Sequence, residues 1–287
     1  MSDPSADVTG RFPRAGSHDT DPASPSTASS PRDLVDALDR WARDTPWVDW
    51  LELAGSLGRG GGDALSDVDA GLGLGAGDGV AERGEQVLAA VLAFAPVAAS
   101  HVQRWGERAA HLIVMYRDGG QLSLVVSPGE ARPGLPPQAV ALLDRSGRLA
   151  DDLPKERWDP DGETVREWAF LAWVAVGDAA RHAHRGHPWR ALRSLTEARE
   201  EVWKLWADRL DLVFPQFGAV TVENADAEPP PGVTDTHPAT LEPDALLAAA
   251  AAMARVLRGV GAPAPDGLAA VVEARLALLS RTRPLKG

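Results

Sequence analysis

The sequence predicts an α+β protein, in which a small mixed β-sheet with helices is followed by a bundle of α-helices. Short β-rich segments, some of them alternating in polarity, gather between residues 47 and 127. Two long segments with helical spacing follow at 163–185 and 188–210. Loop-like sequence separates the two halves, first at 128–137, which is rich in proline, and then at 151–161.

The chain has 287 residues, enough for one large domain or two modest ones. Residues 1–30 are mainly Ser, Pro, Asp and Thr and have almost nothing to bury, so we expect a disordered tail there. We place the sheet domain at 31–135 and the helical domain at 136–287.

Composition excludes several classes of function. A net charge of −12 argues against a broad basic surface, so no nucleic-acid partner is expected. No apolar run reaches the roughly 18 residues that span a bilayer, so no membrane partner is expected either. The beginning of the chain lacks the pattern of a secretory signal, and a cytoplasmic location is the expectation. The absence of cysteine excludes disulfides and thiolate metal sites.

The elements follow in order along the chain. Ser30 is expected to cap a first helix, with Pro31 and Asp33 in its first turn. Strands are expected at 47–53, 66–74 and 96–103, a helix at 82–94, and a hairpin at 111–117 and 121–127. A turn at Gly186 joins the two long helices, a loop covers 224–238, and two Ala- and Leu-rich helices end the chain.

Two aspartates begin the predicted second strand. Asp67 and Asp69 are two residues apart, so both carboxylates point to the same face, while Val68 points into the core. Neighbouring carboxylates repel each other, and a divalent cation relieves that repulsion. Mg²⁺ prefers one or two carboxylates together with phosphate oxygens and water. The pair is therefore a candidate magnesium site.

The turn before these aspartates is suited to phosphate. Gly55 allows a tight turn at the end of the first strand, and Ser56 then offers a backbone N–H and a hydroxyl to a phosphate oxygen. Arg59 adds a positive charge, and the glycines after it allow close approach of the backbone. Ser66 can shape the start of the second strand through local hydrogen bonds.

The segment "AGSLGRGGGDALSDVDAGL" resembles the signature of the nucleotidyltransferase superfamily with a DNA polymerase beta-like fold: a strand, Gly-Ser, about ten residues, then Asp-x-Asp. The layout with a helical second half is similar to that of aminoglycoside adenylyltransferases. The resemblance implies Mg²⁺-dependent transfer of a nucleoside monophosphate from ATP, or another NTP, to a hydroxyl. It also implies that the small-molecule acceptor lies between the two domains.

One position departs from the family pattern, which has a third carboxylate on a later strand. Alternation in the predicted strand 121–127 places Gln121, Ser123 and Val125 on one face, and Ser123 stands where the family has Asp or Glu. A serine hydroxyl carries no charge and is no general base near neutral pH. Either the helical domain supplies the base, or the chain binds nucleotide and metal without catalysing transfer.

Glu167 and Asp178, both on the helix at 163–185, are candidates for that base. Asp178 is the one charged residue between 170 and 180, and a carboxylate in apolar surroundings needs a partner or a function. Pairing of Asp178 with Arg181 is the structural alternative.

The sequence thus favours a nucleotidyltransferase that transfers AMP to a small molecule, with an aminoglycoside-like antibiotic as the leading acceptor class. Two alternatives stay open: a catalytically degenerate nucleotide- or metal-binding protein, and a toxin–antitoxin-type protein that binds a partner chain. The sequence does not fix the oligomeric state.

Overall fold

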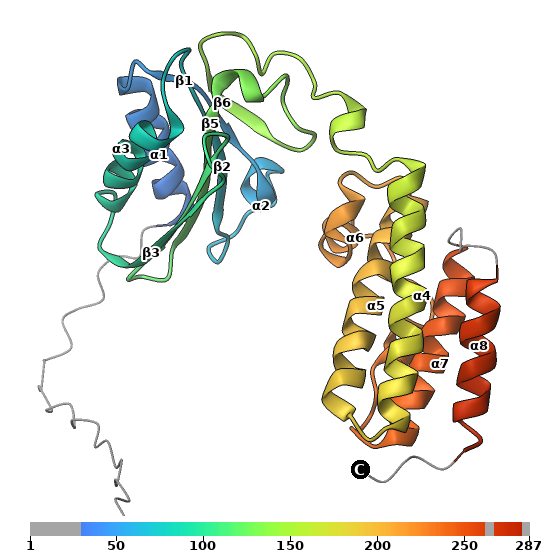
Figure 1. Ribbon diagram of the computed structural model, residues 1–287. Coiled ribbons are helices and arrows are strands. Elements are labelled where there is room, and N and C mark those ends of the chain that lie inside the picture. Colours follow the sequence, from blue (N-terminus) through green and yellow to red (C-terminus); the bar gives the residue numbers. More distant parts are fainter. Residues whose placement is uncertain (1–29, 262–266, 283–287) are drawn as a thin grey trace, which may run out of the picture. The chain divides into compact units, whose positions relative to one another are not determined.

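The computed structural model describes residues 30–261 and 267–282, and the chain divides into two compact units between Ala150 and Asp151 (Figure 1). The predicted α+β architecture is confirmed: a mixed sheet with helices forms the first unit, and helices dominate the second. Of the expected tail at 1–30, all but Ser30 lies outside the described residues.

The described part of the first unit contains a six-stranded sheet with the strand order β3-β4-β5-β2-β1-β6. β2 and β5 are parallel, and the other neighbouring pairs are antiparallel. The strands are β1 (Val48–Leu53), β2 (Val68–Leu74), β3 (Val97–Arg104), β4 (Ala110–Tyr116), β5 (Gln121–Pro128) and β6 (Val140–Asp144).

One face of this sheet forms the hydrophobic core. Alternate residues of β2, β4 and β5 are fully buried there, namely Val68, Leu72, Leu112, Val114, Leu122, Leu124 and Val126. The helices α1 (Pro31–Asp44) and α3 (Val80–Leu92) pack on this face (Figure 1). The opposite face of β4 and β5 carries the half-buried and exposed residues, which leaves that side available for a functional site.

The first helix begins where the sequence predicts. Ser30 accepts a hydrogen bond from the Asp33 N–H, and the Asp33 side chain accepts one from the Ser30 N–H. This reciprocal pair satisfies two of the donors that a helix N-terminus leaves without partners. Leu34 and Leu38 then enter the core one turn apart.

β6 is an element that the sequence analysis does not predict. It pairs with β1 along the edge of the sheet, through Leu143 opposite Leu51 and Val140 opposite Leu53. Residues 136–150, which the sequence analysis places in the helical domain, therefore lie in the first unit. A five-residue edge strand with exposed residues shows little alternation of buried and exposed positions in its sequence. Its pairing with a distant strand is what defines it.

The second unit is a bundle of the long helices α4 (Gly162–His184), α5 (Pro188–Arg209), α7 (Pro243–Val260) and α8 (Leu268–Leu279), with the short α6 (Ala219–Asn224) beside α5 (Figure 1). α4 and α5 are joined at Gly186, which has a positive φ of 70°. Small residues fill the helix contacts, including Ala172, Ala179, Ala191 and Ala198, all fully buried. In the described part of the chain, none of the helices combines the length and apolar character needed to cross a bilayer.

Candidate functional site

β2 positions the two aspartates. Asp69 lies on this strand, Asp67 immediately precedes it, and both side chains are half-buried. Val68 between them is fully buried, as predicted. Gln121 donates a hydrogen bond of 3.4 Å to Asp67 Oδ2 from the start of the neighbouring strand β5.

The turn after β1 packs directly against Asp69. Gly55 begins the single helical turn α2 (Gly55–Gly58) with a φ of +62°, which L side chains rarely adopt. A Cβ at position 55 would lie 3.2 Å from Asp69 Cγ and nearer still to Oδ2, so a side chain has no room there. The Ala54 N–H also donates to the Asp69 carbonyl at 2.8 Å. The structure thus brings the Gly55–Ser56 turn and the aspartates together.

Hydrogen bonds also join the two ends of the glycine-rich loop, residues 56–66. Ser56 Oγ donates to Ser66 Oγ at 3.0 Å, and Ser66 Oγ accepts the Asp63 N–H at 2.9 Å. Ser66 therefore shapes the segment before β2, as predicted from the sequence, and it also holds Ser56. Arg59 ends α2, and its positive charge acts on Asp69.

Burial raises the pKa of Asp69, and the negative charge of Asp67 raises it further. A hydrogen bond from Ser123 and the charges of His111 and Arg59 oppose that rise. Asp67 and Asp69 are two half-buried carboxylates whose negative charges repel each other, and a divalent cation bound beside them would relieve that repulsion. Within the described ranges, no group of three or more His, Asp or Glu side chains is placed to hold a metal ion. Asp67 and Asp69 could supply only part of the coordination of a cation, and phosphate oxygens and water could supply the rest.

The predicted departure at Ser123 lies beside these carboxylates. Ser123 of β5 is the direct neighbour of Asp69 in the parallel β2–β5 ladder. Its hydroxyl oxygen is 2.9 Å from Nε2 of His111, which β4 contributes on the other side of β5. His111 is a residue that the sequence analysis missed. Only the strand register places it at the site, because 42 positions separate it from Asp69 in the chain.

A buried glutamate on β1 is a second feature that the sequence analysis missed. Glu52 is 2% exposed and pairs with Arg132, and its Oε2 has no hydrogen-bond partner. Burial raises the pKa of Glu52, and the charge of Arg132 partly offsets that rise. In the sequence, apolar and polar residues alternate along β1, as in a half-buried strand, and this pattern does not indicate that Glu52 is buried.

Glu167 and Asp178 both lie on α4 in the second unit. Asp178 Oδ1 forms a salt bridge of 2.8 Å with Arg181, so the pairing that the sequence left open as an alternative is present. Glu167 is exposed. The first unit thus brings together Gly55, Ser56, Arg59, Ser66, Asp67 and Asp69, whereas these two carboxylates belong to another compact unit.

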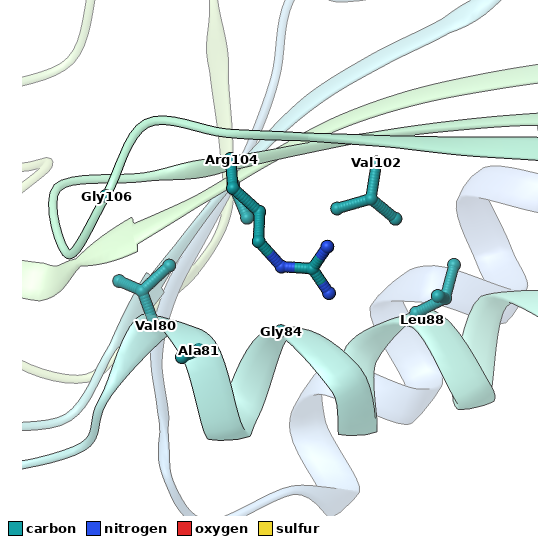
Figure 2. A pocket seen from close by; sticks show the side chains of 8 residues that line it. Val80, Ala81, Gly84, Leu88, Val102, Arg104 and Gly106 are labelled. Carbon is teal, nitrogen blue, oxygen red and sulfur yellow. The ribbon is translucent and has the colours of Figure 1, made fainter.

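A pocket elsewhere in the first unit is separate from these residues. It lies on the helix-covered side of the sheet, where α3 residues Val80, Gly84 and Leu88 face β3 and the Arg104 side chain extends over them (Figure 2). Its volume of about 20 Å³ has room for about one water molecule. A nucleotide does not fit there.

No protein-family model matches the chain, and no curated protein matches it. Among solved structures, the chain is similar to an aminoglycoside 6-adenyltransferase from Bacillus subtilis, with a TM-score of 0.39 and 11% sequence identity. The match covers 90% of this chain and 100% of the other. A likeness this slight carries no argument about function, which must come from the site itself.

Proposed function

We propose that the chain is a Mg²⁺-dependent nucleotidyltransferase that moves a nucleoside monophosphate, AMP from ATP, to a hydroxyl of a small molecule. The observation that carries the proposal is the packing of the Gly55 turn against Asp69. A turn suited to phosphate and a carboxylate pair suited to Mg²⁺ are the two halves of a site for a metal–nucleotide complex.

In this proposal Asp67 and Asp69 hold Mg²⁺, and Ser56 and Arg59 face the triphosphate. When bound, the cation neutralises charge on the phosphates and on the departing pyrophosphate. Ser66 is a positioning residue, because it acts on the phosphates only through its hydrogen bond to Ser56.

An aminoglycoside-like antibiotic is the leading acceptor class. The net charge of −12 supports this choice, since a negatively charged protein attracts the ammonium groups of such a molecule and steers it toward the surface.

Incubation with labelled ATP and Mg²⁺ across a panel of aminoglycosides, lincosamides and protein tyrosines tests the proposal. We expect a labelled product from the wild type, and none when Asp67→Ala removes a cation ligand. Equal label from the wild type and Asp67→Ala, or no label from the wild type with any acceptor, would overturn the proposed activity.

Ser123 favours a second candidate, a protein that binds nucleotide and Mg²⁺ without transferring anything. The Ser123 hydroxyl beside Asp69 is uncharged, so it cannot replace a third carboxylate as a cation ligand. It cannot act as a base near neutral pH either. Mg²⁺-dependent ATP binding without product, together with a gain of transfer in Ser123→Asp, would favour this candidate over the first.

A further inference from the structure

An apolar and aromatic surface lies on β4, on the face of the sheet away from the core. His111, Ile113 and Met115 alternate along this strand on that face, and Met115 is 37% exposed. Trp105, which follows β3 directly, is 49% exposed, and its ring centroid is 6.0 Å from that of His111. These four residues, called the β4 surface below, thus present apolar area where a bound molecule can reach it.

Strand register places the β4 surface beside the proposed cation ligands. Ile113 is the ladder partner of Ser123 on β5, and Ser123 is in turn the partner of Asp69 on β2. Met115 is the partner of Gln121, whose side chain donates a hydrogen bond to the other aspartate of the pair. Two steps between neighbouring strands correspond to about 10 Å, so a molecule of two or three rings spans the distance from β4 to the carboxylates.

The strand order gives the site two sides. In the order β3-β4-β5-β2-β1-β6, the Gly55 turn follows β1 on one side of β2, and the β4 surface lies on the other side. In a phosphoryl-type displacement, the attacking and leaving oxygens lie in line on opposite sides of the phosphorus. Because Ser56 and Arg59 face the triphosphate in the proposed function, pyrophosphate leaves toward the turn, and the attacking hydroxyl comes from the β4 side.

The side chains of the β4 surface are suited to a ring. The flat indole of Trp105 offers apolar contact area, and its face attracts an ammonium group of a ligand. His111 Nε2 lies 2.9 Å from Ser123 Oγ, which holds the imidazole in place, and the planes of the two aromatic rings are inclined by 39°. The flexible thioether of Met115 adapts to the shape of a bound molecule.

We propose that the β4 surface is the acceptor-binding subsite, an inference that rests on the function proposed above. A ring of the acceptor lies flat against Trp105 with an ammonium group over the indole, and its hydroxyl points across β5 toward the α-phosphate at Asp69. The acceptor class is therefore a hydroxylated ring that carries an amino group. Trp105 decides which acceptors bind and takes no part in the chemical step.

The indole signal of Trp105 reports binding without any turnover. In ¹⁵N-labelled protein, the spectrum of Trp105→Phe assigns this N–H, which is then followed as kanamycin, streptomycin or spectinomycin is added. We expect a shift with at least one of these three aminocyclitols. No shift with any of them would overturn the proposal. A shift with Mg²⁺ and α,β-methylene-ATP, and none with the aminocyclitols, would assign the indole to the purine and overturn it too.

Variants then separate acceptor binding from chemistry. Trp105→Leu keeps an apolar side chain but removes the flat aromatic face, so we expect KM for the acceptor to rise about tenfold, with kcat and KM for ATP changed less than about twofold. Trp105→Phe should retain most of the wild-type acceptor affinity, a rescue that shows the aromatic face to be the relevant property.

Trp189→Leu is the matched control, because Trp189 is 70% exposed on α5 in the second unit. We expect its KM for the acceptor to equal that of the wild type. A rise in KM that is confined to Trp189→Leu would place the acceptor on α5 and overturn the proposed subsite.

The outcomes separate the two proposals. If an aminocyclitol shifts the Trp105 signal but the wild type forms no product with any acceptor, the subsite stands and the transfer function is wrong. If the wild type forms product and Trp105→Leu has the same KM for the acceptor, the transfer function stands and the subsite is wrong.

Discussion

Replacing Gly55 by alanine tests whether the turn and the carboxylate pair form one site. Two costs are expected. A non-glycine residue at a φ of +62° costs about 1–2 kcal/mol. The new Cβ would also overlap the Asp69 carboxylate, and relieving such overpacking costs about 1–3 kcal/mol more. We therefore expect Gly55→Ala to lower the free energy of unfolding by about 2–5 kcal/mol, the sum of these two ranges.

Gly147→Ala is the matched control, because Gly147 lies in the turn after β6, outside the proposed site. Gly147 has a φ of +74° and nothing within 4 Å of a built Cβ, so this variant incurs only the backbone cost. The difference between their free energies of unfolding, measured by calorimetry, isolates the cost of the overlap with Asp69. In an Asp69→Ala background the difference should shrink, because the overlapping carboxylate is gone.

The two variants should also differ in Mg²⁺–ATP binding and in turnover. Clearing the overlap moves the Asp69 carboxylate by about 1 Å, and a displacement of that size can lower turnover about 10²-fold. We expect Gly55→Ala to lose Mg²⁺–ATP binding and turnover, and Gly147→Ala to keep most of both. If the two variants are equally stable and bind Mg²⁺–ATP equally well, the turn does not position Asp69 and the reasoning is wrong.

Three further predictions concern the rest of the structure. Burial raises the pKa of Glu52 above its ordinary 4.5, so the folded state binds more protons than the unfolded state. The free energy of unfolding therefore falls as the pH rises from 4.5 through the raised pKa. In unfolding titrations, Glu52→Gln should remove that part of the pH dependence. Arg132→Met should lower the free energy of unfolding at neutral pH by about 3 kcal/mol, because it leaves the buried carboxylate without its counter-charge. Asp178→Asn should change the free energy of unfolding by less than about 1 kcal/mol, since its salt bridge to Arg181 is partly exposed; a larger loss in denaturant titration would show that the pair is structural. Ser30→Ala should cost about 1 kcal/mol by removing the cap of α1, and unchanged thermal unfolding would contradict that role.

Local patterns are sufficient to predict many of the elements. The capping residues at Ser30 and Asp33 set the start of α1, and alternation in β5 correctly separates buried Leu122 and Leu124 from Ser123. These signals act over a few residues, so they are readable in one segment at a time. β6 has no such signal, and its pairing with β1 is what defines it.

The sequence by itself determined the α+β class and the Gly-Ser and Asp-x-Asp segments that make up most of the candidate site. Tertiary structure alone decided their surroundings. Parallel pairing of β2 with β5 places Ser123 beside Asp69, and antiparallel pairing of β4 with β5 brings His111 to Ser123. The physical reason is that strand order and register depend on contacts between segments far apart in the chain, for which no single segment carries a signal. The cluster of Asp69, Ser123 and His111 therefore forms only when three strands are aligned.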